Sequence, residues 1–285
     1  MALIYQIAWR YHEGFTHEVG AMVAVAATLW AFERVVSEAR LRDYLLLGLV
    51  AGLGVMTDMT YWMFLVTLLL AALLQQPIRV RLADWRLVIA GLVAAMIATP
   101  YAIALTFFAR APLHFIVRHS TNEWVNLGKG LLDAFRGPLF YLSPLIVLLP
   151  LFFPGFLRTA LGDLRSAFSA RDERDAPDMQ RLVLMQGLCG IGLCVAGAVL
   201  FGASGYAMHR LMPLYLPSVI WLMGVARRSS DDTAPRRRFA AFAALIAVVA
   251  LSARLANMFV LDPVCKICRW GVPYAGLAAE LRARG

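Results

Sequence analysis

Histidines and carboxylates cluster near the start of the chain, where His12, Glu13, His17 and Glu18 fall within seven residues. Glu13 and His17 are four residues apart, so on a helix they could share a face. Such a pair could bind a metal ion or act as a general acid and base. The competing interpretation is a segment at the membrane interface whose polar side chains are solvated. These residues are therefore candidates for lining a cavity, and they do not by themselves predict a metal site.

A second candidate is the pair His209-Arg210, which directly precedes an apolar stretch. The planar guanidinium of an arginine matches phosphate oxygens, so Arg210, with His209 beside it, could bind a phosphate group. An arginine at this position could equally extend its charge to the membrane interface. Arg254 is the one basic residue well inside an apolar stretch, and the same two interpretations apply to it.

Asp58 lies between two apolar runs. A carboxylate that faced lipid at mid-bilayer would cost roughly 2.5–3.5 kcal/mol. We therefore expect the Asp58 side chain in a protein-lined cavity or in water outside the membrane. Alternatively, it caps the helix that follows it.

Cys265 and Cys268 form a CxxC motif in the C-terminal tail. Two cysteines are too few for a zinc site, which normally needs four ligands, and no thioredoxin-like βαβ pattern surrounds them. We predict a local disulfide in an oxidising compartment. No metal ion and no cofactor is expected.

Eight apolar stretches must position these residues. The chain has 285 residues and is 61% hydrophobic, whereas a soluble domain is about half apolar, and a helix needs about 20 residues to cross the hydrocarbon. We therefore predict an all-α polytopic membrane bundle over residues 1–260 and an outward-facing tail over 261–285. The predicted spans are 18–33, 44–57, 60–75, 86–108, 139–157, 182–202, 211–226 and 239–260.

Arginines decide how these spans are threaded. If residues 44–75 form a hairpin that turns at Asp58, one side of the membrane carries 16 basic residues and the other carries 10. A single span there would divide them almost evenly, with 12 on one side and 14 on the other. Because basic residues favour the cytoplasmic side, we predict the hairpin. The arginine-rich connections are 34–43, 76–86, 158–181 and 227–238.

This threading places the candidate residues on one side of the membrane. Residues 1–17, the Asp58 turn and residues 203–210 face outward, as do 109–138 and the tail, which in a bacterium means the periplasmic face of the inner membrane. The connections 158–181 and 227–238 are predicted to be ordinary solvated loops in the cytoplasm. The net charge of +9 is explained by contact with anionic membrane lipids and not by nucleic acid.

Five segments carry a family resemblance. They are Gly14-Phe15-Thr16-His17-Glu18, residues 43–57, Ala98-Thr99-Pro100, residues 209–213 and residues 265–278. In order and in topology they resemble glycosyltransferase family 39 of the GT-C superfamily. That family includes protein mannosyltransferases and lipid A aminoarabinose transferases.

The resemblance implies a polytopic helical enzyme with an outward-facing active site. Its donor would be a sugar linked to polyprenyl phosphate, and its acceptor would be a lipid, a glycan or a protein. Arg210, with His209 and Arg254, would bind the donor phosphate and stabilise it as it departs. The polar residues at 13–18 and Asp58 would be candidates for the cavity around the donor.

The chain also departs from the family pattern. The family's catalytic aspartate lies in an earlier outward loop and has no counterpart here, and Asp58 stands where relatives often have a lysine. We therefore expect a partial or inactive form, with the tail at 261–285 beginning a truncated periplasmic domain. The alternative is a non-enzymatic transporter, a lipid-handling protein or a structural membrane subunit.

Overall fold

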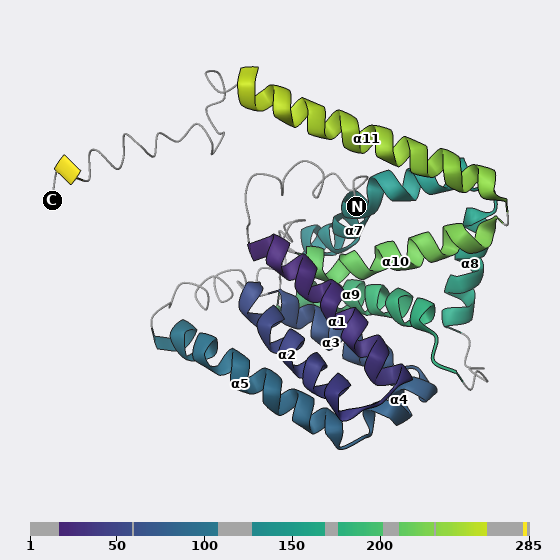
Figure 1. The fold of residues 1–285 in the computed structure, drawn as a ribbon. Helices are drawn as coiled ribbons and strands as arrows, with labels where there is room; N and C mark the ends of the chain where they lie inside the picture. The colour runs from purple at the N-terminus through teal and green to yellow at the C-terminus, as the bar shows by residue number, and fades with distance from the viewer. Residues whose placement is uncertain are drawn as a thin grey trace.

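The computed structural model describes residues 17–58, 60–107, 127–168, 176–201, 211–230, 232–260 and 282–283. Within these ranges the chain is helical and contains no strand, so the predicted all-α class is confirmed. Figure 1 shows the arrangement of the helices. They are α1 (His17–Ser37), α2 (Leu41–Thr57), α3 (Tyr61–Leu73), α4 (Gln76–Leu82), α5 (Arg86–Phe107), α7 (Leu127–Phe152), α8 (Phe156–Ala167), α9 (Met179–Phe201), α10 (Met212–Ser229) and α11 (Thr233–Val260).

The number of full membrane crossings is lower than predicted. A helix lies at each of the eight predicted positions, but among the described residues only α1, α5, α7 and α9 are long and apolar enough to cross, or five spans if α3 and α4 count as one broken span. The reason is length and charge. α3 has 13 residues, or about 20 Å at 1.5 Å per residue, and the last turn of α10 carries Arg227 and Arg228.

The predicted start of the span at 139 and the predicted start of the loop at 158 are both wrong, because the polar segments next to these positions are helical. α7 begins at Leu127 and not at 139, since its buried residues, from Gly130 and Ala134 through Tyr141 to Leu149, form one continuous helical stripe. Part of the supposed loop 158–181 belongs to α8. The helices therefore extend further toward both ends of the bundle than the apolar stretches alone indicate.

The chain turns at Asp58, as the predicted hairpin requires. α2 ends at Thr57 and α3 begins at Tyr61, whose ring lies so close to Gly54 that a side chain there would collide with it. At the other end of the pair, the Tyr44 hydroxyl donates to the Arg81 carbonyl in α4 at 3.4 Å. α3 therefore returns to the end from which α2 started, and α4 then departs at 115°.

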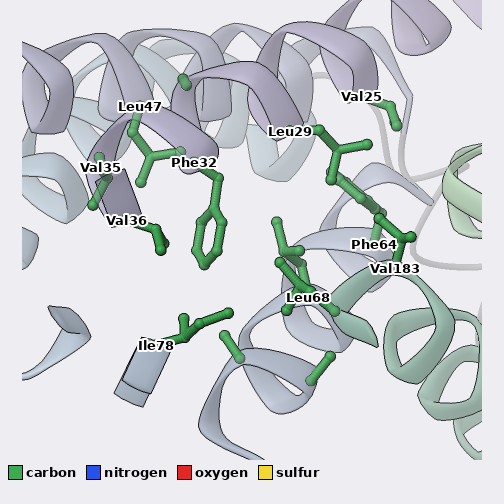
Figure 2. Packing of buried hydrophobic residues seen from close by; sticks show 14 of the residues in the cluster. Val25, Leu29, Phe32, Val35, Val36, Leu47, Phe64, Leu68, Ile78 and Val183 are labelled. Atoms are coloured by element: carbon green, nitrogen blue, oxygen red, sulfur yellow. The ribbon is translucent and has the colours of Figure 1, made fainter. Parts of the chain in front are cut away.

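Two apolar cores hold the bundle together. The first lies among α1, α2, α3, α4 and α9, where the α1 residues Val25, Leu29, Phe32 and Val36 repeat at helical spacing and point into the centre (Figure 2). The second lies among α7, α8, α9, α10 and α11. α9 contributes to both cores and joins the two halves.

α5 is held against α2 by glycines. A Cβ on Gly48 would lie 2.9 Å from the Cβ of Val93, and one on Gly52 would lie 2.9 Å from the Ala94 carbonyl oxygen. Small residues four apart allow two membrane helices to approach closely. Most of the remaining surface of α5 is exposed, since only 6% of its span is buried, as expected of a lipid-facing helix.

The arginine-rich connections gather at one end of the bundle. Arg86 donates to the Ala39 carbonyl at 2.7 Å, and Arg236 donates to the Arg227 carbonyl at 2.9 Å. In Figure 1 the last turns of α1 and α10 and the first turns of α9 and α11 all lie toward the right. This is the arrangement that the predicted threading requires, and the side of the membrane that it faces stays a prediction.

Candidate functional site at the end opposite the arginines

The opposite end of the bundle brings together the start of α1 and the Asp58 turn. A Cβ on Gly20 would lie 3.2 Å from the Thr57 side chain, so the first turn of α1 packs on the last turn of α2. His17 and Glu18 are the first two residues of α1. The backbone of His17 and Glu18 therefore lies within about one helical turn of the contact with Thr57, the residue before Asp58.

The start of α10 converges on the same region. Leu211 and Met212 are buried in the second core with Ala134 of α7. Val19 of α1 and Met63 of α3 pack against that same core. His209 and Arg210 themselves lie outside the described residues, as do Glu13, Cys265 and Cys268. The chain nevertheless enters this region directly after Arg210.

Asp58 forms the turn between α2 and α3. Its Oδ1 accepts hydrogen bonds from the Thr60 backbone N–H and hydroxyl, both at 2.7 Å. Its carbonyl accepts one from the Tyr61 N–H at 3.1 Å. These bonds support the interpretation that Asp58 caps the start of α3. The carboxylate is at the predicted end of the bundle, and a cavity role for it stays a prediction.

Arg254 is the predicted site residue that the fold keeps apart from the others. α11 packs on α7 through its first half, where the ring of Phe152 lies 5.6 Å from that of Phe239 and 5.4 Å from that of Phe242. Arg254 follows three turns later, in the half of α11 that diverges from α1 and α10 (Figure 1). The described helices thus do not bring the Arg254 backbone to the start of α10.

Gln186 is a buried polar residue that sequence reasoning missed. It is 0% exposed, and its Nε2 donates to the Thr67 hydroxyl and to the Leu214 carbonyl, both at 3.0 Å. It therefore links α3, α9 and the first turn of α10. A lone glutamine within the apolar stretch 182–202 was the signal in the sequence. Gln186 thus holds the start of α10, the helix that follows Arg210 in the sequence.

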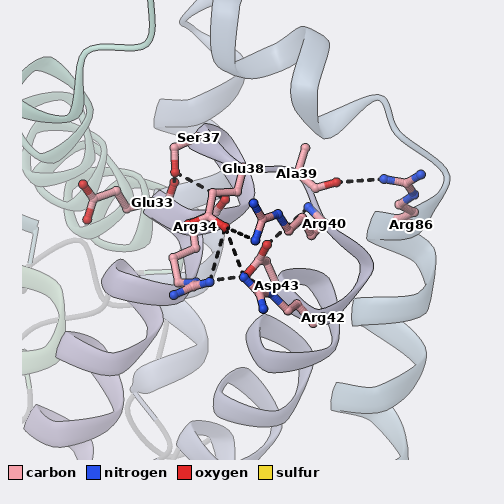
Figure 3. Close-up of polar contacts among 9 residues, drawn as sticks. All are labelled: Glu33, Arg34, Ser37, Glu38, Ala39, Arg40, Arg42, Asp43 and Arg86. Atoms are coloured by element: carbon pink, nitrogen blue, oxygen red, sulfur yellow. Dashed lines mark hydrogen bonds and ion pairs between the residues drawn. The ribbon is translucent and has the colours of Figure 1, made fainter.

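The arginine end has its own ionic network, shown in Figure 3. Arg34 Nε donates to Asp43 Oδ1 at 2.9 Å, and the Asp43 side chain is 1% exposed. Glu38 pairs with Arg34, Arg40 and Arg42 at 3.4, 3.2 and 3.5 Å. Each of the three arginines therefore has a carboxylate partner. The network connects the end of α1 to the start of α2, and it leaves little net positive charge with which to bind a ligand.

Asp43 should be the critical member of that network. Burial raises the pKa of the Asp43 carboxyl, but the hydrogen bond and charge of Arg34, the Arg40 N–H and the charge of Arg42 outweigh burial and hold the pKa below its usual value. The stabilisation is thus complete above the ordinary aspartate pKa and disappears as the pH falls through the lowered one.

Replacing Asp43 with asparagine is expected to lower the melting temperature of the detergent-solubilised protein at pH 7, because Arg34 loses its buried partner. The gap between wild type and variant should close as the pH falls below about 4. Glu33→Gln is the control, since Glu33 is exposed on the same helix. A gap that is equal at pH 7 and in acid would contradict this role.

A small cavity lies at the arginine end, among the described residues. This cavity between α8, α9 and α10 has a volume of about 40 Å³ and is bordered by Asp163, Asp178 and Arg228. Ligand pockets are typically about 300–1,000 Å³. Among the described residues, no group of three or more His, Cys, Asp and Glu could hold a metal ion.

Comparison with known proteins supports the resemblance seen in the sequence. Residues 1–103 match the family described as dolichyl-phosphate-mannose-protein mannosyltransferase. The chain is a multi-pass helical membrane protein that is similar to glycosyltransferases of the GT-C type. No solved structure matches it.

Two relatives from Rhizobium johnstonii are similar over nearly the whole chain. The lipopolysaccharide core galacturonosyltransferase RgtA is 29% identical over 283 residues, which cover 97% of this chain and 54% of RgtA. The lipopolysaccharide core galacturonosyltransferase RgtB is 23% identical over 287 residues, covering 97% and 55%. The chain thus spans about half the length of these relatives. They favour a glycosyltransferase over a transporter or a structural subunit.

Proposed function

We propose that this chain forms part of an enzyme that transfers a sugar from a polyprenyl-phosphate donor, at the outward face of a bacterial inner membrane. The observation that carries the proposal is the convergence of three chain segments at the end opposite the arginines. These segments are the start of α1, the Asp58 turn and the start of α10. Each of them carries or adjoins a residue that could contact a donor or an acceptor.

The chemistry of the donor suits this location. When the bond between the sugar and the phosphate breaks, negative charge develops on the departing phosphate oxygen, which an arginine can stabilise. The lipid tail keeps the donor in the bilayer, so its phosphate stays at the level of the helix ends. Arg210, directly before the buried Leu211, is the residue that we assign to that phosphate. His209 adjoins it in the sequence.

The names of the relatives suggest an acceptor class. RgtA and RgtB are galacturonosyltransferases of the lipopolysaccharide core. We therefore propose a uronic acid as the first sugar to test and the core of a lipopolysaccharide as the first acceptor. A lipid-anchored acceptor would reach the outward end of the bundle from the same bilayer surface as the donor.

Donor binding by the full-length protein tests this function. Native mass spectrometry should show a complex with a polyprenyl-phosphate-linked sugar and with polyprenyl phosphate. The matched control is the unphosphorylated polyprenol, which we expect to bind more weakly because the phosphate supplies the contact with Arg210. Equal binding of the polyprenol and its phosphate would refute the assigned phosphate site.

A further inference from the structure

We propose that α8 lies in the membrane surface and binds anionic phospholipid headgroups at the arginine end of the bundle. The segment was expected to be part of a solvated loop, and the proposed transferase function makes no use of it. Three features of α8 carry the inference: its place in the fold, the order of its faces, and two exposed arginines.

The turn before α8 is built to keep the helix at the end of the bundle. α7 ends at Phe152 and α8 starts at Phe156, and a Cβ on Gly155 would lie 2.7 Å from the Ser229 carbonyl at the end of α10. Only a residue without a side chain fits this approach. In Figure 1, α8 runs across the ends of its neighbours instead of along them.

Asp163 fastens α8 to α10 in that position. Its Oδ2 accepts a hydrogen bond from Trp221 Nε1 at 3.0 Å and pairs with Arg228 Nη2 at 2.6 Å. Trp221 and Arg228 belong to the last half of α10. α8 is therefore held at the level where α10 leaves the apolar region and its terminal arginines begin, which is the level of lipid headgroups.

The faces of α8 follow one another around the helix in an order suited to an interface. Phe156, Ala160 and Ala167 are buried against the bundle. One residue later in each case, about 100° further around the helix, Leu157, Leu161 and Phe168 form a stripe that is 59%, 54% and 73% exposed. Such a stripe is unfavourable in water but is stabilised when it dips into the acyl region.

The next face around the helix carries Arg158 and Arg165, both exposed. They are seven residues apart, so they share a side of the helix and stand about 10 Å apart along it. The one acidic residue of α8, Asp163, is already paired with Arg228. Two guanidiniums beside an exposed apolar stripe match a phospholipid, whose phosphate lies next to its acyl chains.

Charge distinguishes α8 from the other arginine cluster at this end. The arginines between α1 and α2 are paired with Glu38 and Asp43 (Figure 3), whereas within the described ranges neither Arg158 nor Arg165 lies within ion-pair distance of a carboxylate. An arginine near an anionic membrane surface contributes about fivefold to lipid affinity. The pair should therefore contribute about 25-fold, and it favours anionic over zwitterionic lipid.

Titration of the purified full-length protein with phosphatidylglycerol, followed by native mass spectrometry, tests the proposal. The double variant Arg158→Gln/Arg165→Gln should bind phosphatidylglycerol about 25-fold more weakly, with phosphatidylcholine binding unchanged. The control is Arg237→Gln/Arg238→Gln, which removes the same charge from exposed positions on α11 at the same end. It should lose less affinity, because in the described part of the chain no stripe of large exposed apolar side chains lies beside those two arginines to hold the lipid there. Leu157→Ser should also weaken binding, because the stripe would no longer favour the acyl region.

Three results would overturn the proposal. Equal loss of phosphatidylglycerol affinity in both double variants would mean that only total charge matters. Unchanged affinity in the α8 variant would mean that its exposed stripe faces a protein and not lipid. Inorganic phosphate is included as a soluble competitor, and displacement of the lipid by millimolar phosphate would likewise show an anion site without a lipid role. Arg158→Lys/Arg165→Lys, which keeps the charge, should retain most of the affinity.

Discussion

Replacing Arg210 with alanine is expected to slow sugar transfer by the full-length protein by about 100- to 1,000-fold, the usual cost of removing one group that stabilises developing negative charge. The physical reason is that the departing phosphate gains charge as the sugar leaves, and the guanidinium would be its nearest cation. The start of α10, which follows Arg210 directly in the sequence, is buried against α7 and linked through Gln186 to α3 and α9.

Rates and binding should respond differently to this change. Donor affinity is expected to fall less than the maximal rate, because the phosphate carries more charge in the transition state than in the donor. Arg210→Lys should recover part of the rate, since it keeps the charge but loses the planar fork. Arg237→Ala, at the opposite end of the bundle, is the control and should leave the rate unchanged. A wild-type rate in Arg210→Ala would remove this residue from the site.

Replacing Gly48 with leucine is expected to destabilise the protein by about 3 kcal/mol, the upper part of the usual range for overpacking. The backbone of α5 at Ala90 and the Val93 side chain occupy the space that a side chain at Gly48 would need. α5 could make room only by moving away from α2. Since α5 is otherwise exposed to lipid, little other packing would hold it.

Thermal unfolding in detergent measures this effect, with an expected fall in melting temperature of about 10 °C. Gly91→Leu is a matched control on the same helix pair, because a Cβ at Gly91 meets no atom within 4 Å. The control should melt within a degree or two of the wild type. Equal melting temperatures for Gly48→Leu and Gly91→Leu would mean that α2 and α5 do not pack as described.

The sequence predicts best where one local property decides the structure. The hairpin at Asp58 follows from arginine counts, and the Asx-type bonds of Asp58 to Thr60 close it. The starts of α5 and α9 lie within three residues of their predicted positions. In each case an apolar run is long enough, and its charged ends are clear enough, to place the helix without knowledge of its neighbours.

Short amphipathic helices cannot be predicted from an apolar run and its charged ends. α4 and α8 contain arginines at close spacing and look like solvated loops. Their helicity depends on contacts with residues far away in the chain, such as Gly155 with Ser229 and Asp163 with Trp221. The same holds for Gln186, whose partner Thr67 is 119 residues away. No pattern within a short window predicts such pairings.

The sequence predicts at which end of the bundle the candidate site lies, but not how the side chains of the site are arranged. Counting basic residues placed Glu18, Asp58 and Arg210 on one side of the membrane, and the contact of Gly20 with Thr57 brings the first two segments together. The family resemblance grouped Arg254 with them, although the second half of α11 diverges (Figure 1). Charge patterns report the side of a membrane, whereas helix packing decides which residues on that side meet.

Sugar transfer by the full-length protein in proteoliposomes is the most direct test of the central claim. The donor is a polyprenyl phosphate that carries a radiolabelled uronic acid, and the acceptor is a lipopolysaccharide that lacks that sugar. The account predicts that label appears on the acceptor while one polyprenyl phosphate is released for each sugar transferred. Donor that binds to the protein but stays intact with every lipid, glycan and protein acceptor offered would contradict it.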